Sequence, residues 1–147
     1  MRQAGMFALV LTASIAGAAD FVPSEPVPPD IQLGAFRDLV EAKGEFVRCL
    51  TTNGLDPPPE VMAQFRSNVT PVVRGSECAT THHGAFRRSD RSPAELVELS
   101  GAHVFGDAAT LEYVRVRYGM CADNGQLSLR RQGPVWIVYA HTLGPIC

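Results

Sequence analysis

The sequence predicts an α+β fold in which two N-terminal helices pack on a four-stranded antiparallel meander sheet. Two observations lead to this prediction. Apolar residues recur at helical spacing in the first half of the chain, and they alternate with polar residues in the last third. Packing the apolar stripes of the helices on one face of the sheet would close a single core.

The sheet is predicted from four segments with strand character that are separated by turn-forming residues. The segments are Glu95–Phe105, Ala109–Cys121, Gly125–Arg131 and Val135–Thr142. Because the connections are short and rich in Gly, Asp and Asn, the strands are expected to pair as an antiparallel meander. The last segment is apolar on both faces, so it is expected to be central or covered on both sides.

The second segment shows the clearest alternation. One set of alternating positions is apolar or aromatic, namely Val114, Val116, Tyr118 and Met120, and the other contains Arg115, Arg117 and Gly119. A period of two is typical of a strand with one buried and one solvated face. The arginines are therefore expected on the solvated face.

The helices are predicted from about Leu33 to Leu50 and from Pro58 to about Ser67. Gly44 weakens the middle of the first helix, and Asn53-Gly54 is expected to end it. Asp56 followed by proline is a typical N-cap for the second helix. Residues 69–73, which include Pro71, are expected to form at most a short edge strand. Residues 74–93 are expected to be a long irregular loop.

The N-terminus has the features of a secretory signal peptide. Arg2 precedes the apolar stretch from Gly5 to Ala16, and small residues place cleavage near Ala18 or Ala19. The expected organisation is a signal peptide at 1–19, an extended proline-rich leader at 20–33 and one domain at 34–147. The apolar stretch is too short to span a bilayer comfortably, so no membrane span is expected after cleavage and a secreted or periplasmic location is predicted.

The cysteine count fits an exported chain. The four cysteines are Cys49, Cys78, Cys121 and Cys147, and an even number in such a context predicts two disulfides. The strand directions of the meander place Cys121 and the C-terminus at one end of the sheet. The preferred pairing is therefore Cys49 with Cys78 and Cys121 with Cys147. A metal site at Cys78, His82 and His83 is disfavoured because no ligand spacing matches, and no metal or cofactor is expected.

Arginines and aromatics supply the candidate binding surfaces. A cationic surface for an anionic envelope component or an acidic protein would be built from Arg87, Arg88, Arg91, Arg115, Arg117 and Arg130. A solvated face without a role is the competing interpretation. The formal net charge of −2 argues against a nucleic-acid partner. A second candidate is a pocket lined by Tyr113, Tyr118, Trp136, His103 and His141.

Helices followed by a long antiparallel sheet that ends in a Trp-containing strand look like the cystatin-like or NTF2-like superfold. This resemblance covers roughly the last hundred residues and rests on element order rather than on a motif. Those folds include inhibitors, ligand binders and enzymes. The first hypothesis is therefore a non-catalytic binding domain that contacts a protein or envelope component. The alternative is an NTF2-like enzyme or small-ligand carrier with a pocket at the open end of the sheet.

Overall fold

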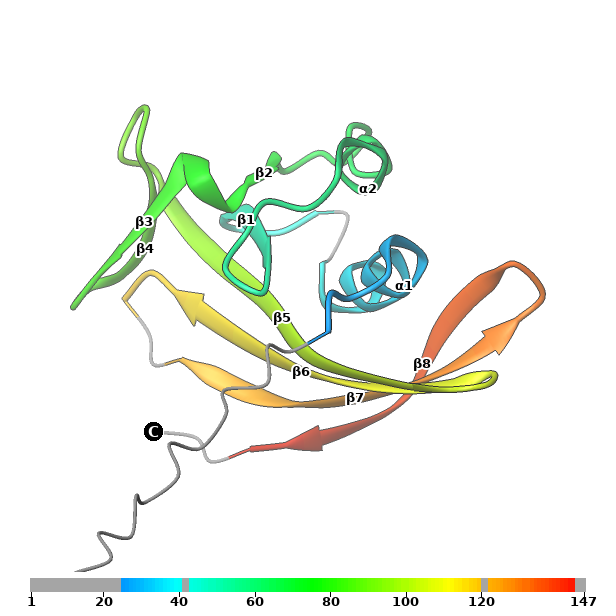
Figure 1. Ribbon diagram of the computed structural model, residues 1–147. Helices are drawn as coiled ribbons and strands as arrows, with labels where there is room; N and C mark the ends of the chain where they lie inside the picture. Colours follow the sequence, from blue (N-terminus) through cyan, green and yellow to red (C-terminus); the bar gives the residue numbers. More distant parts are fainter. Residues whose placement is uncertain (1–24, 41–42, 120–121, 145–147) are drawn as a thin grey trace, which may run out of the picture.

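The computed structural model describes residues 25–40, 43–119 and 122–144. The elements follow the order α1 (Pro29–Leu39), β1 (Val47–Thr52), α2 (Pro59–Ala63), β2 (Val72–Arg74), the 3-10 turn η1 (Gly75–Glu77), β3 (Cys78–Thr81), β4 (Gly84–Arg87), β5 (Pro93–Phe105), β6 (Ala108–Arg117), β7 (Asp123–Gln132) and β8 (Val135–Leu143). In Figure 1 the sheet is strongly curved, and α1 lies on its concave side. Within the described ranges, no helix is long and apolar enough to cross a membrane.

The predicted fold class is wrong. The eight strands form one mixed sheet, in which β2-β1-β5-β6-β7-β8 are neighbours in that order and the β3–β4 hairpin joins β5. Strand β1 runs parallel to both β2 and β5. Helix α1 has 11 residues and α2 only five, so the protein is mainly a sheet with one substantial helix.

The meander itself is confirmed. Strands β5 to β8 pair antiparallel in sequence order, and their bounds lie close to the predicted ones. The expected central position of β8 is wrong, because this strand lies at the edge of the sheet. Its two apolar faces have different surroundings. Trp136 is buried beneath α1, whereas Ile137 and Tyr139 are 42% and 59% exposed.

The first predicted helix is wrong beyond Leu39. Residues 29–33, expected in the extended leader, begin α1, with Pro29 at its first position and Asp30 in its first turn. The segment Val47–Thr52 is strand β1, and all six of its residues are buried. A strand buried on both faces has no alternation in its sequence, so its apolar residues also fitted a helical stripe.

The following segments also differ from the prediction. The second helix shrinks to α2, since the residues after Ala63 form turns. The expected edge strand exists as β2, shifted to Val72–Arg74. The loop predicted at 74–93 is largely ordered as η1 and the β3–β4 hairpin, whose two-residue connection is His82-His83. Short strands with little apolar alternation gave no periodic signal in this region.

The core lies between α1 and the concave face of the sheet. The helix contributes Ile31, Ala35, Phe36, Leu39 and the following Val40, and the sheet contributes Leu50, Val97, Leu99, Leu111, Tyr113, Leu127, Leu129 and Trp136. Three polar contacts fasten α1 to the last two strands, two of them to β8 and one to β7. The indole Nε1 of Trp136 donates to Asp30 at 2.9 Å, Arg131 lies 3.9 Å from the same carboxylate, and His141 Nε2 lies 2.8 Å from the Asp38 carboxylate.

The alternation in β6 was assigned to the wrong face. Leu111 and Tyr113 point into the core, so Arg115 and Arg117 lie on the same concave face, while Val114 is 37% exposed on the convex face. Both arginines have an ionic partner on this face, because Glu95 on the neighbouring strand β5 contacts them. The apolar residues of β6 did not identify the buried face, because an ion cluster occupies part of it.

Candidate functional site

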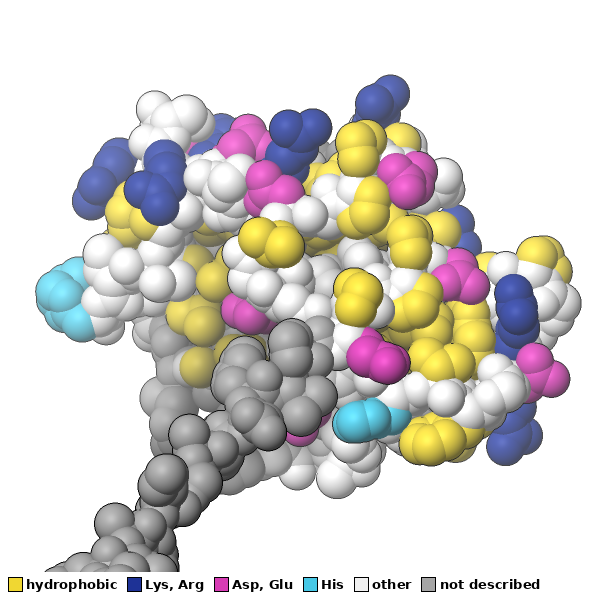
Figure 2. All heavy atoms as spheres, viewed as in Figure 1, with side chains coloured by type: hydrophobic (Ala, Val, Ile, Leu, Met, Phe, Trp, Pro, Cys, Tyr) yellow, Lys and Arg dark blue, Asp and Glu magenta, His cyan; other side chains and the backbone are white. Residues whose placement is uncertain are grey.

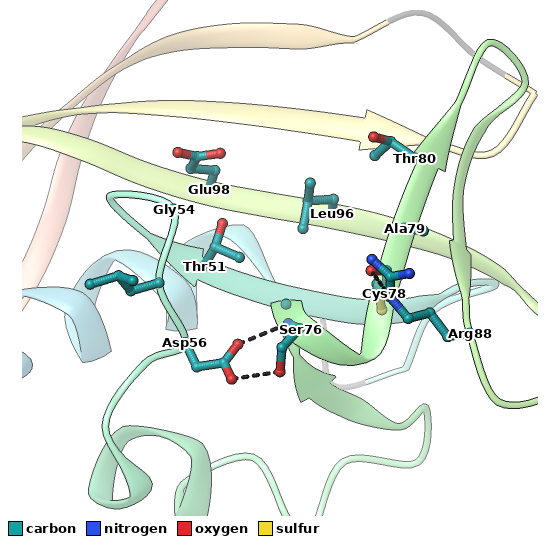
Figure 3. Close-up of a pocket in the computed structure, with 12 residues that line it drawn as sticks. Thr51, Gly54, Asp56, Ser76, Cys78, Ala79, Thr80, Arg88, Leu96 and Glu98 are labelled. Atoms are coloured by element: carbon teal, nitrogen blue, oxygen red, sulfur yellow. Dashed lines mark hydrogen bonds between the residues drawn. The ribbon is translucent and has the colours of Figure 1, made fainter.

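The candidate site is a cleft of about 580 Å³ on the convex side of β1 and β5. Its lining residues come from the end of β1 and the turn after it, from the consecutive elements η1 and β3, from Arg88 after β4, and from β5. They are Thr51, Gly54, Leu55, Asp56, Gly75, Ser76, Cys78, Ala79, Thr80, Arg88, Leu96 and Glu98. Figure 3 shows β3 on one side of this cleft and the 54–56 segment on the other.

The first wall is formed by a tight turn. Asn53 and Gly54 have φ of 50° and 74°, and the backbones of Thr52 and Leu55 exchange two hydrogen bonds of 2.8 and 3.0 Å. Asn-Gly favours this left-handed two-residue turn. The turn reverses the chain at the end of β1, so that Leu55 and Asp56 come to line the cleft. The same dipeptide was predicted to end a helix.

The base of the cleft is held by a polar clamp between two loops. The Asp56 carboxylate accepts hydrogen bonds from the Ser76 backbone N–H at 2.8 Å and from the Ser76 hydroxyl at 2.6 Å, as drawn in Figure 3. Close packing brings η1 against β1. A Cβ atom at Gly75 would lie 1.9 Å from Thr51 Cγ2, so only glycine permits this approach.

The second wall is covalently attached to the sheet. Cys49 on β1 forms a disulfide with Cys78 on β3, which confirms the first predicted pairing. Both cysteines are buried in a small cluster with Val47, Ala85 and Ala94. The guanidinium of Arg88 donates to the Cys78 carbonyl at 2.8 Å and adds a second tie at the same point. Cleft and disulfide therefore form one rigid unit.

The floor of the cleft contains polar groups without partners. Thr51 and Glu98 are register neighbours on β1 and β5, and both face the cleft. Thr51 is 8% exposed, and its hydroxyl has no hydrogen-bond partner among the described residues. Within those same ranges, the Glu98 carboxylate makes no hydrogen bond or ion pair. The Thr51 hydroxyl is buried, so it is closed to a ligand, whereas the half-buried Glu98 carboxylate is accessible from the cleft.

The six candidate arginines occupy separate places. Arg87 pairs with Asp90, Arg88 contacts Cys78, and Arg91 lies 4.3 Å over the Phe86 ring, so all three serve the region of the β4–β5 turn. Arg115 and Arg117 lie on the concave face with Glu95, and Arg130 lies 5.1 Å over the ring of Tyr139 at the far end of the sheet. Figure 2 shows basic side chains near the β4–β5 turn and others near the β7–β8 turn, with acidic and hydrophobic side chains between them. The structure does not bring the six together.

The five residues of the predicted aromatic pocket do not converge either. Tyr113 and Trp136 are buried in the core. Tyr118 and His103 lie at opposite ends of the β5–β6 hairpin, since the Tyr118 N–H donates to Ala94 whereas His103 pairs with Thr110. His141 contacts Asp38 and approaches Tyr113 edge-on, with 6.3 Å between ring centroids.

A buried ion cluster lies on the opposite face of the sheet from the cleft. Glu95 is 2% exposed and contacts Arg48 at 2.9 Å, Arg117 at 3.0 Å and Arg115 at 3.8 Å. Arg115 also donates two hydrogen bonds of 2.9 and 2.7 Å to Asp123, and this interaction raises the pKa of Arg115 above its ordinary value. Each guanidinium of the cluster contacts a carboxylate, so the cluster is structural in character.

No group of three or more His, Cys, Asp or Glu residues within the described ranges is placed to hold a metal ion. His82 and His83 are exposed in the β3–β4 turn with their rings 3.8 Å apart. The predicted signal peptide and the predicted Cys121–Cys147 pair lie outside the described residues. No protein-family model, curated protein or solved structure matches this chain.

Sequence reasoning did not identify the residues that build the cleft. Asp56 was predicted as the N-cap of the second helix, and the predicted site residues did not include Thr51 or Glu98. A usable signal was present in Asn53-Gly54, because this dipeptide between β-branched or apolar residues is typical of a hairpin turn. Had β1 been recognised, Thr51 and Glu98 would still have required knowledge of the parallel β1–β5 pairing.

Proposed function

We propose that this protein is an exported, non-catalytic binding domain that captures a protein or envelope component in the cleft between β1, β3 and β5. The observation that carries the proposal is the unpaired Glu98 carboxylate on the floor of a cleft whose β3 wall is joined to the sheet by a disulfide. A rigid cleft is suited to binding because little conformational entropy is lost when a ligand enters.

Export is supported by two features. The N-terminal apolar stretch has the length and flanking residues of a signal peptide. The Cys49–Cys78 disulfide is compatible with an oxidising compartment outside the cytosol. Fractionation of cells that produce the full chain tests this part of the proposal. We expect the processed protein in the envelope or medium, and retention of the intact chain in the cytosol would contradict export.

The cleft is tested by filling it. Ala79→Trp places a large side chain against the β3 wall, whereas Ala108→Trp places the same side chain at the far end of the convex face and serves as the matched control. The oxidised chain without its first 19 residues would be incubated with the native envelope fraction, and bound proteins would be quantified. The amount of specific partner bound is expected to fall at least tenfold for the Ala79→Trp variant and less than twofold for the control.

A photo-crosslinking residue gives an independent measurement. Placed at Leu55, which is 71% exposed at the cleft, it is expected to crosslink the captured partner. Placed at Ile137 on β8, it is expected not to. A partner that still binds the Ala79→Trp variant and crosslinks only at position 137 would overturn the assignment of the cleft. It would locate binding on the exposed face of β8 instead.

A further inference from the structure

The cleft has a charge preference. Its lining contains two carboxylates, on Asp56 and Glu98, and one guanidinium, on Arg88, which leaves an excess of one negative charge. Asp56 is committed to Ser76, and Arg88 donates to the Cys78 carbonyl. Within the described residues, Glu98 is the carboxylate of the lining that makes no hydrogen bond or ion pair. A cationic group entering the cleft would therefore meet an unneutralised acid.

Glu98 is the polar group that a ligand can reach on the floor of the cleft, because the Thr51 hydroxyl beside it is buried. An ammonium or guanidinium group donates several hydrogen bonds and can pair with this carboxylate. Leu55, Leu96 and Ala79 offer apolar surface for the aliphatic part of such a side chain.

One wall of the cleft is also an open strand edge. Within the described residues, β3 pairs with β4 on one side only. The Arg88 N–H donates to the Glu77 carbonyl at 2.8 Å, which fixes the phase of the antiparallel ladder. Hydrogen-bonded pairs alternate along such a ladder, so the backbone N–H and carbonyl of Thr80 point away from β4. Thr80 lines the cleft, and these two groups are free to pair with an added strand.

From these features we infer that the cleft binds an extended peptide segment that carries a lysine or arginine side chain. The peptide backbone pairs with Thr80 at the edge of β3, and the cation of its basic side chain reaches Glu98. Strand addition supplies affinity and the acidic floor supplies selectivity. The inference rests on the proposed function, since it specifies the ligand class of the same cleft.

The test uses the oxidised chain and the peptide acetyl-Thr-Val-Lys-Val-Thr-amide, with binding followed by calorimetry and by NMR shifts of the cleft amides. Three comparison ligands separate the contributions. A peptide with norleucine in place of lysine removes the charge, and a peptide with an N-methyl group on the central amide removes a backbone donor. n-Butylamine keeps the cation without a peptide backbone. The norleucine and N-methyl peptides are each expected to bind at least tenfold more weakly.

The protein variants are Glu98→Gln and, as a matched control, Glu112→Gln, which changes an exposed glutamate on β6 outside the cleft. We expect Glu98→Gln to weaken lysine-peptide binding at least tenfold and Glu112→Gln less than twofold. Circular dichroism verifies that both variants fold. Equal binding of the lysine and norleucine peptides, or unchanged binding by Glu98→Gln, would overturn the inference. Binding of n-butylamine as tightly as the peptide would also overturn the inference, because it would show that the cleft binds a cation without a peptide backbone.

Failure of this inference can be told apart from failure of the proposed function. If Ala79→Trp abolishes capture of the native partner while the lysine peptide does not bind, the cleft remains the binding site and its ligand is of another class. If the native partner is captured equally well by Ala79→Trp, the cleft itself is excluded.

Discussion

Two glutamates three residues apart on β5 have opposite surroundings. Glu95 faces the concave side of the sheet, where it is 2% exposed and contacts three arginines. Glu98 faces the convex side, where it lines the cleft and has no partner among the residues that the structure describes. A charge that is withdrawn from water must be paired within the protein, whereas a partly solvated charge can remain unpaired when no ligand is bound. If the proposed function holds, the two faces of one strand separate stability from binding.

The pairing of Glu95 also fixes which strands meet. Arg48 comes from β1 and Arg117 from β6, so the carboxylate joins the parallel and antiparallel parts of the sheet. Breaking such a buried cluster by removing one member leaves the others uncompensated. Glu98 has no such role, and its carboxylate can be replaced without disturbing an interaction.

The largest expected effect follows from this contrast. Glu95→Gln should lower the free energy of unfolding by about 3–5 kcal/mol, because three arginines lose their buried counter-ion. Glu98→Gln should change it by no more than about 0.5 kcal/mol, as is usual for a position without partners. Urea denaturation of both variants measures the difference. Equal losses would show that Glu98 is also part of the folding core and would remove the separation of roles.

The disulfide gives the next largest effect. It closes a loop between cysteines 29 residues apart, so the double variant Cys49→Ala, Cys78→Ala should lose about 2–4 kcal/mol of stability. The loss should be uneven, because the bond attaches β3 to the convex face of β1. Hydrogen exchange is expected to accelerate at the amides of β3 and less at those of β6. Equal acceleration of hydrogen exchange at β3 and β6 would mean that loss of the disulfide destabilises the cleft wall and the strand of the ion cluster to the same extent.

The meander could be predicted from the sequence because local signals determine it. Turn residues and alternation define β5 to β8 without reference to the rest of the chain. Strand β1 was missed for the opposite reason. Val47, Cys49 and Leu50 are buried on both sides by β2, β5 and α1, and a parallel central strand has no alternation to reveal it.

The site was harder to predict than the fold. The assumption that arginines mark the solvated face of β6 failed at Arg115 and Arg117, since a single buried acid from another strand reverses the rule. Thr51 and Glu98 become neighbours only through the parallel β1–β5 register. Contacts of this kind depend on pairing between segments more than 40 residues apart, and no local pattern encodes them. The disulfide between Cys49 and Cys78 was predictable because cysteines themselves report long-range contacts.

A smaller effect is expected where α1 closes the concave face. Trp136→Phe keeps an aromatic ring in the core and removes the Nε1 donor to Asp30, so the loss should be about 1 kcal/mol. Asp30→Asn keeps an acceptor and should cost less. Thermal unfolding of the two variants measures both. A loss above that of the disulfide variant would mean that the attachment of α1 to β8, rather than the Glu95 cluster, limits the stability of this face.

The smallest effect is expected at the ion pair between Arg87 and Asp90 on the protein surface. The guanidinium of Arg87 and then the hydroxyl and N–H of Ser92 hold the pKa of Asp90 well below its ordinary value. A depressed pKa in the folded state means that the contribution to stability is present at neutral pH and is lost as the pH falls below about 4. An NMR titration of the Asp90 carboxyl should show a midpoint that rises toward about 4 in Arg87→Gln. Because exposed pairs contribute little, this shift should occur with almost no change in unfolding at pH 7, unlike removal of Glu95. A titration midpoint that is the same in the variant would show that the Ser92 contacts alone hold the carboxylate ionised.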